Sequence, residues 1–156
     1  MKLVRSFYYA FCGIVYCIRT ERNFRVHLTA GLGVLLFSVL YGLERADYPP
    51  LILTIALVMT LEAVNTAVER AVDLKTADSR PLAKAAKDAA AAAVLLGAAA
   101  AVAVAVFTFS DTDRLLAALG ALHSPGVLAG AVFYAAAGLW FVFGFGRHTK
   151  EKGTRK

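Results

Sequence analysis

The chain has 156 residues, of which 59% are apolar, and a formal net charge of +6 at neutral pH. The mean hydropathy is +0.62, and the apolar residues occur in long runs. This composition is too apolar for an ordinary soluble domain of this size and indicates an integral membrane protein. In such a protein a positive charge favours membrane topology and anionic lipid headgroups, so no nucleic-acid partner is expected.

The first predicted element is an amphipathic helix over residues 3–20. Its apolar residues recur at helical spacing on one face, and arginines, tyrosines and a cysteine occupy the other. The length and the interrupting arginines favour a helix that lies on the membrane surface rather than one that spans it. Residues 20–27 are predicted to form a charged connection to the next element.

Three apolar segments are then predicted to cross the membrane, over residues 28–43, 49–74 and 82–109. Prolines open the second and third of these helices, where a missing N–H costs little. Residues 110–124 are interpreted as a mixed connection, residues 125–145 as a fourth span and residues 147–156 as a basic tail. The expected fold is therefore all-α, with one surface helix, three spans and an additional fourth span.

The basic residues assign the two sides of the membrane. Segments 1–27, 70–87 and 147–156 fall on one side and hold all but two of the 17 lysines and arginines; the exceptions are Arg45 and Arg114. Cytoplasmic loops carry an excess of Lys and Arg, so this side is predicted to face the cytoplasm.

A polar stripe follows the second predicted span. Glu62, Asn65, Thr66, Glu69 and Asp73 fall within roughly 100° of one another on a helix that advances about 100° per residue. Ionisable groups at membrane depth are expensive and usually face a protein interior or a water-filled site. Three carboxylates on one face also repel each other unless cations are present. The stripe therefore predicts a functional site.

Three polar segments are expected to meet at the cytoplasmic surface: residues 21–25, 62–73 and 80–88. Their carboxylates could hold Mg²⁺ and their basic side chains could offset phosphate charge, which suits phosphoryl transfer. The sequence contains no P-loop and no kinase glycine-rich loop, which excludes a soluble kinase fold. The residues alone leave open a transporter or proton pathway, and a set of purely structural ion pairs.

Three segments carry a resemblance to the small prokaryotic diacylglycerol kinase family, which includes undecaprenol kinases. They read Glu-Arg-Asn-Phe-Arg-Val-His (21–27), Glu-Ala-Val-Asn-Thr-Ala-Val-Glu-Arg-Ala-Val-Asp (62–73) and Ala-Lys-Ala-Ala-Lys-Asp-Ala-Ala-Ala-Ala-Ala-Val (83–94). The resemblance covers about residues 1–110 as a membrane lipid-kinase domain, and leaves residues 111–156 as an appendage outside it.

The resemblance implies a homotrimer in the bacterial inner membrane, with shared active sites at the cytoplasmic interface. It implies transfer of the ATP γ-phosphate to a lipid hydroxyl with Mg²⁺ as cofactor. The Phe-Arg-Val-His run looks more like the undecaprenol kinases than the diacylglycerol kinases, so undecaprenol is the first expected lipid and diacylglycerol the alternative.

By position, the resemblance implies that Glu62 is the catalytic carboxylate and that Asn65 orients groups beside it. Glu21 and Glu69 match acids that contact metal and nucleotide. Further nucleotide contacts are expected from Tyr9, Asp78, Ser79, Arg80, Lys87 and Asp88, and lipid contacts from Lys2, Arg25 and Glu62. His27 is interpreted as a headgroup anchor or a site group, and Asp73 as a partner for a neighbouring cation or a site group.

Overall fold

The computed structural model describes residues 2–75 and 80–145, and the fold of these residues is all-α as predicted. The helices are α1 (Lys2–Thr20), α2 (Arg22–Tyr41), α3 (Tyr48–Lys75), α4 (Pro81–Thr108), α5 (Thr112–Ala121) and α6 (Pro125–Leu139). A short 3₁₀ turn, η1 (Arg45–Asp47), precedes α3, and a π-helix, η2 (Trp140–Gly144), continues α6.

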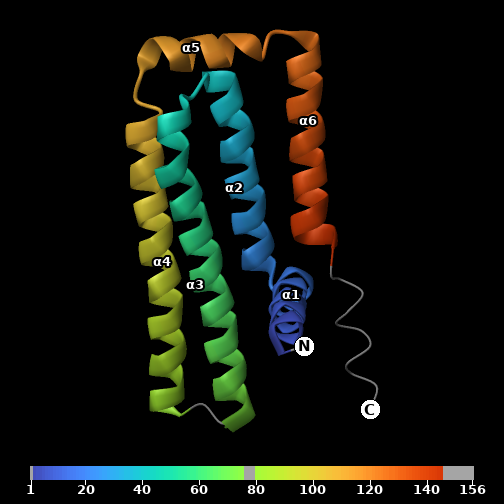
Figure 1. Cartoon of the computed structure of the whole chain (residues 1–156), viewed down its shortest axis with the longest axis vertical. Coiled ribbons are helices and arrows are strands. Elements are labelled where there is room, and N and C mark those ends of the chain that lie inside the picture. Colours follow the sequence, from blue (N-terminus) through green and yellow to red (C-terminus); the bar gives the residue numbers. More distant parts are fainter. Residues whose placement is uncertain (1, 76–79, 146–156) are drawn as a thin grey trace.

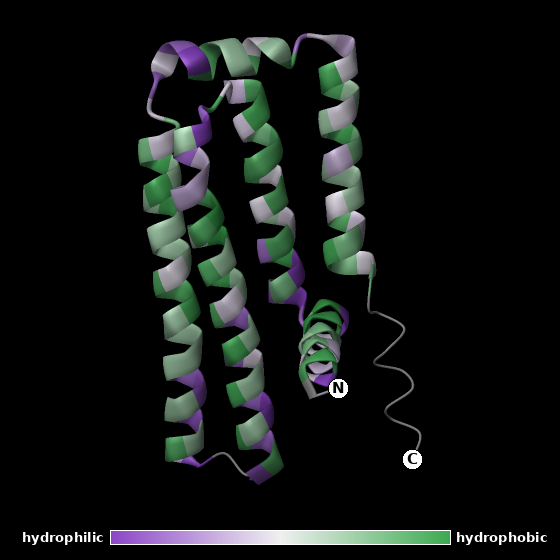
Figure 2. Ribbon diagram, in the orientation of Figure 1, coloured by the Kyte–Doolittle hydropathy of each residue, from purple (hydrophilic) through white to green (hydrophobic). Residues whose placement is uncertain are grey.

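Among the described residues, four helical segments are long and apolar enough to cross a membrane: Arg22–Tyr41, Arg45–Lys75, Pro81–Thr108 and Pro125–Gly144. They run alongside one another, with hydrophobic residues along their length and hydrophilic residues more frequent towards the ends (Figures 1 and 2). This confirms the four predicted spans. The third and fourth bury only 6% of their most apolar window inside the chain, so most of their surface is open to lipid or to another protein.

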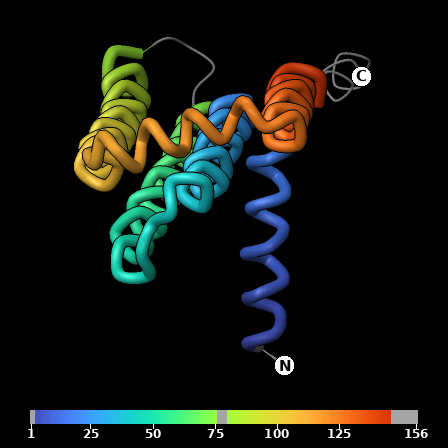
Figure 3. Tube along the Cα trace, turned by 90° about the horizontal axis from the view of Figure 1, so that it is seen from above, coloured from blue at the N-terminus to red at the C-terminus, as the bar shows by residue number. Residues whose placement is uncertain are grey.

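Helix α1 departs from the direction of the spans. Figure 1 views it end-on below α2, and Figure 3 shows it extending away from the other helices. Its N-terminal residues are exposed, including the large apolar side chains of Leu3, Phe7 and Phe11. This arrangement agrees with the predicted surface helix, because an exposed apolar face suits the boundary between headgroups and acyl chains.

Two segments differ from the sequence prediction. Residues 22–27, predicted as a connection, form the first turns of α2, and Phe24 and Arg25 within them are buried rather than exposed to water. Residues 112–121, also predicted as a connection, form helix α5 across the end of the bundle (Figure 1). The side chain of Asp111 caps α5 by accepting hydrogen bonds from the backbone N–H groups of Asp113 and Arg114, both at 3.0 Å.

The closest helix pair is α3 with α4. A Cβ atom on Gly97 would lie 2.5 Å from Leu61 Cδ1, so any larger residue at this position would force the Leu61 side chain to move. The alanines of α4 allow close packing in the same way. This packing brings the polar stripe of α3 close to α4, where Asp73 contacts Lys87.

A few predicted features cannot be placed. Asp78, Ser79 and the basic tail lie outside the described residues, and only the backbone of Lys2 is described.

Candidate active site

Glu62 is the centre of the candidate site. It lies on α3 and is buried, with 4% of its surface exposed. Its Oε1 atom has no hydrogen-bond partner among the described residues, and His27 Nε2 of α2 is 3.7 Å away. A buried acceptor without a donor is costly, so such an atom in a native structure points to a missing ligand.

The next turn of α3 extends this arrangement towards the C-terminal end of the helix. Asn65 Nδ2 donates to Glu69 Oε1 at 3.1 Å, whereas Asn65 Oδ1 is buried without a partner in the described structure. The hydroxyl of Thr66 donates to the backbone carbonyl of Glu62 at 3.0 Å. Glu62, Asn65 and Glu69 therefore share one face of the helix, whereas the hydroxyl of Thr66 is used in a hydrogen bond to the backbone.

A pocket of about 220 Å³ lies beside Glu62 and Asn65. It is formed where α2, α3 and α4 meet, and its lining is Asn23, His27, Glu62, Asn65, Ala91, Val94, Leu95 and Ala98. The small side chains of α4 leave the space, and α3 supplies two unpartnered acceptor oxygens. The pocket can therefore take a hydroxyl donor or a cation.

Other charged residues of the stripe form ion pairs nearer the helix ends. Glu21 accepts from Arg70 at 2.7 Å, and Asp73 accepts from Lys87 at 2.5 Å. On α4, Lys84 lies 2.5 Å from Asp88. Predicted nucleotide contacts Glu21, Lys87 and Asp88 are thus engaged with protein partners. Such exposed pairs contribute at most about 1 kcal/mol, so a polyphosphate could replace them.

The donor set is compatible with Mg²⁺. No group of three or more His, Cys, Asp and Glu residues that could hold a metal occurs within residues 2–75 and 80–145. Mg²⁺, however, needs only one or two protein carboxylates when phosphates and water complete its shell. Glu69, with the unpartnered oxygen of Asn65 beside it, offers oxygen ligands of the required kind.

Arg25 has a different environment from the one predicted. It is buried, with 6% exposure, and its guanidinium donates to the carbonyls of Ile18 (2.9 Å), Arg19 (3.5 Å) and Val142 (3.2 Å). This geometry favours a structural role over contact with a lipid headgroup.

Two other predicted nucleotide contacts stand apart from the pocket. Tyr9 is 61% exposed on α1, and Arg80 is exposed at the start of α4. Neither residue lines the pocket beside Glu62.

Sequence reasoning did not find a groove of about 730 Å³ between α1 and α3. Small or apolar residues form much of it: Ala10, Gly13 and Ile14 of α1, and Ala63 and Ala67 of α3. The small residues on facing helices were the available signal.

Cys17 borders this groove and is buried at 5% exposure. Burial raises the pKa of its thiol, and a hydrogen bond with Thr66 opposes that effect only in part. The thiol therefore stays protonated and acts as an apolar group in the groove.

Residues 8–109 match the sequence profile of the family described as prokaryotic diacylglycerol kinase. The chain belongs to this family. The first of the curated relatives is a diacylglycerol kinase of Synechocystis sp., 50% identical over 98 residues, which cover 62% of this chain and 56% of the relative. The chain therefore spans little more than half the length of that relative. No solved structure matches the chain.

Two further members of the family are similar to the same part of the chain. An undecaprenol kinase of Bacillus subtilis is 45% identical over 93 residues, covering 60% of this chain and 76% of the relative. A diacylglycerol kinase of Helicobacter pylori is 30% identical over 96 residues, covering 62% and 75%. The family match ends at residue 109, so α5, α6 and η2 lie beyond it.

Within the family region, the sequence left His27 open as a headgroup anchor or a site group, and the structure places it 3.7 Å from Glu62. A single histidine at a membrane boundary is usually an interfacial anchor, and only the α2–α3 packing brings its ring to Glu62.

Proposed function

We propose that this protein is a lipid kinase that transfers the γ-phosphate of ATP to the hydroxyl of a membrane lipid. The proposal depends chiefly on the environment of Glu62. Its carboxylate is buried, has an oxygen without a partner in the described structure, and lines a pocket beside His27. Membership of a family whose curated members are named lipid kinases supports the same reaction.

Glu62 would accept the proton of the lipid hydroxyl as that oxygen attacks the γ-phosphorus. The new bond joins the lipid oxygen to the γ-phosphorus while the bond from that phosphorus to the β,γ-bridging oxygen breaks, and ADP leaves. Asn65 would orient the reacting groups through its free carbonyl oxygen. His27, 3.7 Å from Glu62, would hold the carboxylate in position.

Glu69 and Glu21 would hold Mg²⁺ together with the nucleotide phosphates. The ion would neutralise the charge that develops on the phosphates during transfer. Lys87 and Asp88 would contact the nucleotide after leaving Asp73 and Lys84, and Arg80 and Tyr9 stay proposed contacts at its edge. Glu62 lies seven residues, or about 10 Å, deeper along α3 than Glu69, which separates the lipid end of the site from the aqueous end.

The proposed setting is the bacterial inner membrane with the site on the cytoplasmic side. Arg70 and Lys87 lie at this end, which agrees with the excess of positive charge in cytoplasmic segments. A homotrimer with shared sites is also part of the proposal. The largely exposed surface of α4 supports it, because a helix of this length with 6% burial can pack against other copies.

Undecaprenol is the first candidate lipid, on the Phe-Arg-Val-His segment that contains His27. Diacylglycerol is the second, because a relative named diacylglycerol kinase is 50% identical. Both present a terminal hydroxyl on long apolar chains, so the same groove and pocket could serve either.

The test uses the purified full-length chain in mixed micelles with Mg²⁺ and ATP labelled at the γ-phosphate. Undecaprenol and diacylglycerol are supplied separately at equal mole fraction, and label in the lipid phase is measured. We expect transfer to at least one, with undecaprenol preferred. Transfer to neither would contradict the proposal. Ion flux through vesicles holding the protein, without lipid-dependent ATP consumption, would support a transporter instead.

A further inference from the structure

The fourth span packs on α2 in a regular antiparallel register. Arg25 meets Val142, Thr29 meets Gly138, and Gly33 meets Tyr134. Each step is four residues on both helices, so the contacts recur about once per turn along one face of each. A Cβ on Gly138 would lie 2.9 Å from Thr29 Cγ2, which shows how closely the helices approach. The hydroxyl of Tyr134 also donates to the carbonyl of Thr29.

This register ends at the guanidinium of Arg25, which joins three elements. Its N–H groups reach Ile18 and Arg19 at the end of α1, and Val142 in η2. Carbonyls in the last turn of a helix lack partners within it and favour a nearby cation. Arg25 therefore links the C-terminal end of the surface helix to the last turn of the fourth span. We call Arg25 and its three partners, Ile18, Arg19 and Val142, the Arg25 joint.

The fourth span is adapted to this contact. Helix α6 widens into the π-helix η2 at Trp140, with a hydrogen bond from Phe145 N to Trp140 O. π-Helical turns are rare and occur mostly at functional positions. Val142 is the one buried residue within Pro125–Gly144. The span is therefore most enclosed where it meets Arg25.

The Arg25 joint lies at the C-terminal end of the long helix α1. Helix α1 has 19 residues, or about 28 Å, and its outer part is exposed. A rotation of about 5° at its C-terminal end would displace its far end by roughly 2.5 Å. The same helix forms one wall of the groove whose other wall is α3. The angle of α1 therefore sets the width of that groove.

We propose that the fourth span, acting through Val142 on Arg25, positions α1 and so sets the width of the groove that takes the apolar chain of the lipid substrate. Arg25 is a positioning residue in this proposal. The claim that the groove takes a lipid chain rests on the proposed function. The claim that the fourth span sets the angle of α1 depends only on the contacts of Arg25, Thr29 and Gly33 with that span.

The test compares Gly138→Leu with Gly130→Leu. A side chain at 138 must push against Thr29, whereas a Cβ at 130, two turns away, meets nothing within 4 Å. Gly138→Leu leaves Arg25 itself intact. Arg25→Lys is the second variant, since one ammonium keeps the charge but cannot serve three carbonyls in the same geometry.

The first readout is a distance across the joint. Spin labels are placed on Leu3→Cys, near the far end of α1, and on Leu82→Cys of α4, in a background in which Cys12 and Cys17 are replaced by alanine. The labelled protein is diluted with unlabelled chain to remove distances between copies. Both labelled positions are exposed. We expect Gly138→Leu and Arg25→Lys to shift or broaden the distance distribution by about 2–3 Å, and Gly130→Leu to leave it unchanged.

The second readout is kinetic. We expect Gly138→Leu to raise KM for the lipid about tenfold, while KM for ATP stays within about twofold. Unchanged distances in both variants would overturn the proposal, as would equal increases in the two KM values. Changed distances in a protein that phosphorylates no lipid would instead contradict the proposed function and leave the joint standing. Should Gly138→Leu fail to fold, Arg25→Lys decides by the same two readouts.

Discussion

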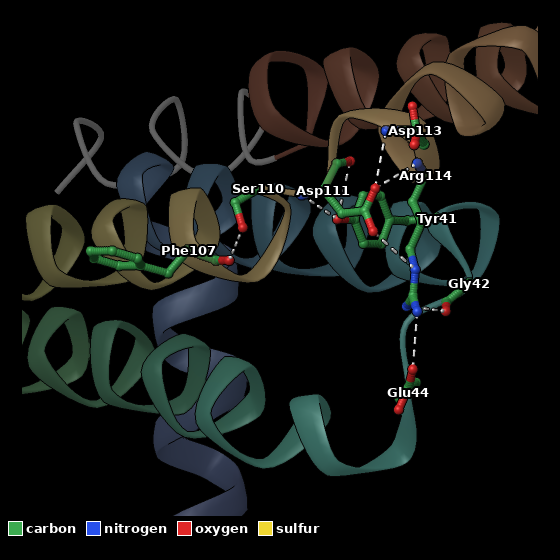
Figure 4. A network of polar contacts seen from close by, with 8 residues as sticks. All are labelled: Tyr41, Gly42, Glu44, Phe107, Ser110, Asp111, Asp113 and Arg114. Carbon is green, nitrogen blue, oxygen red and sulfur yellow. Dashed lines mark hydrogen bonds and ion pairs between the residues drawn. The ribbon is translucent and has the colours of Figure 1, made fainter.

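The two ends of the bundle use polar residues in opposite ways. At the end with α5, the hydroxyl of Tyr41 accepts from the N–H of Asp111 at 3.0 Å, and Arg114 contacts Glu44 at 3.0 Å (Figure 4). Arg114 also donates to the carbonyl of Gly42. The hydrogen bond to Glu44 raises the pKa of the Arg114 guanidinium. Tyr41, Glu44, Asp111 and Arg114 therefore all have protein partners at this end.

At the end with α1, Glu62 Oε1 and Asn65 Oδ1 are buried and lack partners in the described structure. Native proteins leave few buried acceptors unpaired, and those few usually mark an unfilled site or a strained group. The end with α5 is thus closed by polar contacts between its own residues, whereas the other end keeps two buried oxygens unpaired beside ion pairs such as Arg70–Glu21. Three sets of variants test this contrast.

The largest effect is expected from Glu62→Gln. The substitution keeps the shape but removes the base, so lipid phosphorylation should fall by about 100-fold or more, with helix content unchanged by circular dichroism. Glu44→Gln at the opposite end is the matched control and should keep the rate. Full activity in Glu62→Gln would remove the catalytic assignment.

A smaller effect separates Glu69 from Asp73 on the same face of α3. Glu69→Gln can still accept from Asn65 but loses the charge proposed for the metal, so kcat should fall about tenfold and the Mg²⁺ concentration for half-maximal rate should rise. Asp73→Asn loses only an exposed pair with Lys87, so the rate should stay within about twofold. Titration of the initial rate with Mg²⁺ makes the comparison, and equal losses would show that both acids serve the metal.

The smallest effect is expected at the end of the bundle that is covered by α5. Tyr41→Phe removes the hydroxyl that bonds to Asp111, and should lower the free energy of unfolding by about 1 kcal/mol without changing kcat. Unfolding by increasing SDS in mixed micelles measures the loss. Ser110→Ala removes a hydroxyl that is exposed and local to α4, so a smaller loss is expected there. A change in kcat for Tyr41→Phe would mean that the two ends are coupled.

Sequence alone predicted the features that depend on local composition. Apolar run length gave the four spans, and the helical period placed Glu62, Asn65 and Glu69 on one face of α3. Helix α5 was missed although Asp111, followed by Asp113, is a recognisable start signal, because the short segment was interpreted by its polarity rather than its cap.

Contacts between distant residues could not be predicted. Arg70 pairs with Glu21, 49 residues away, and Lys87 pairs with Asp73 across the loop between α3 and α4. Each pairing depends on the crossing of two helices, which a residue period does not define. The burial of Arg25 has the same origin, since one of its three partner carbonyls, that of Val142, belongs to a span outside the matched family region.

The Arg25 joint also constrains the order in which the chain can mature. Arg25 and Val142 are separated by 117 residues, so the ribosome adds the whole of α3, α4 and α5 between them. At about 5–20 residues per second this takes roughly 6 to 23 s. During that interval α1 and α2 exist without the carbonyl that completes their junction, and the surface helix reaches its final angle only after synthesis of the fourth span is complete.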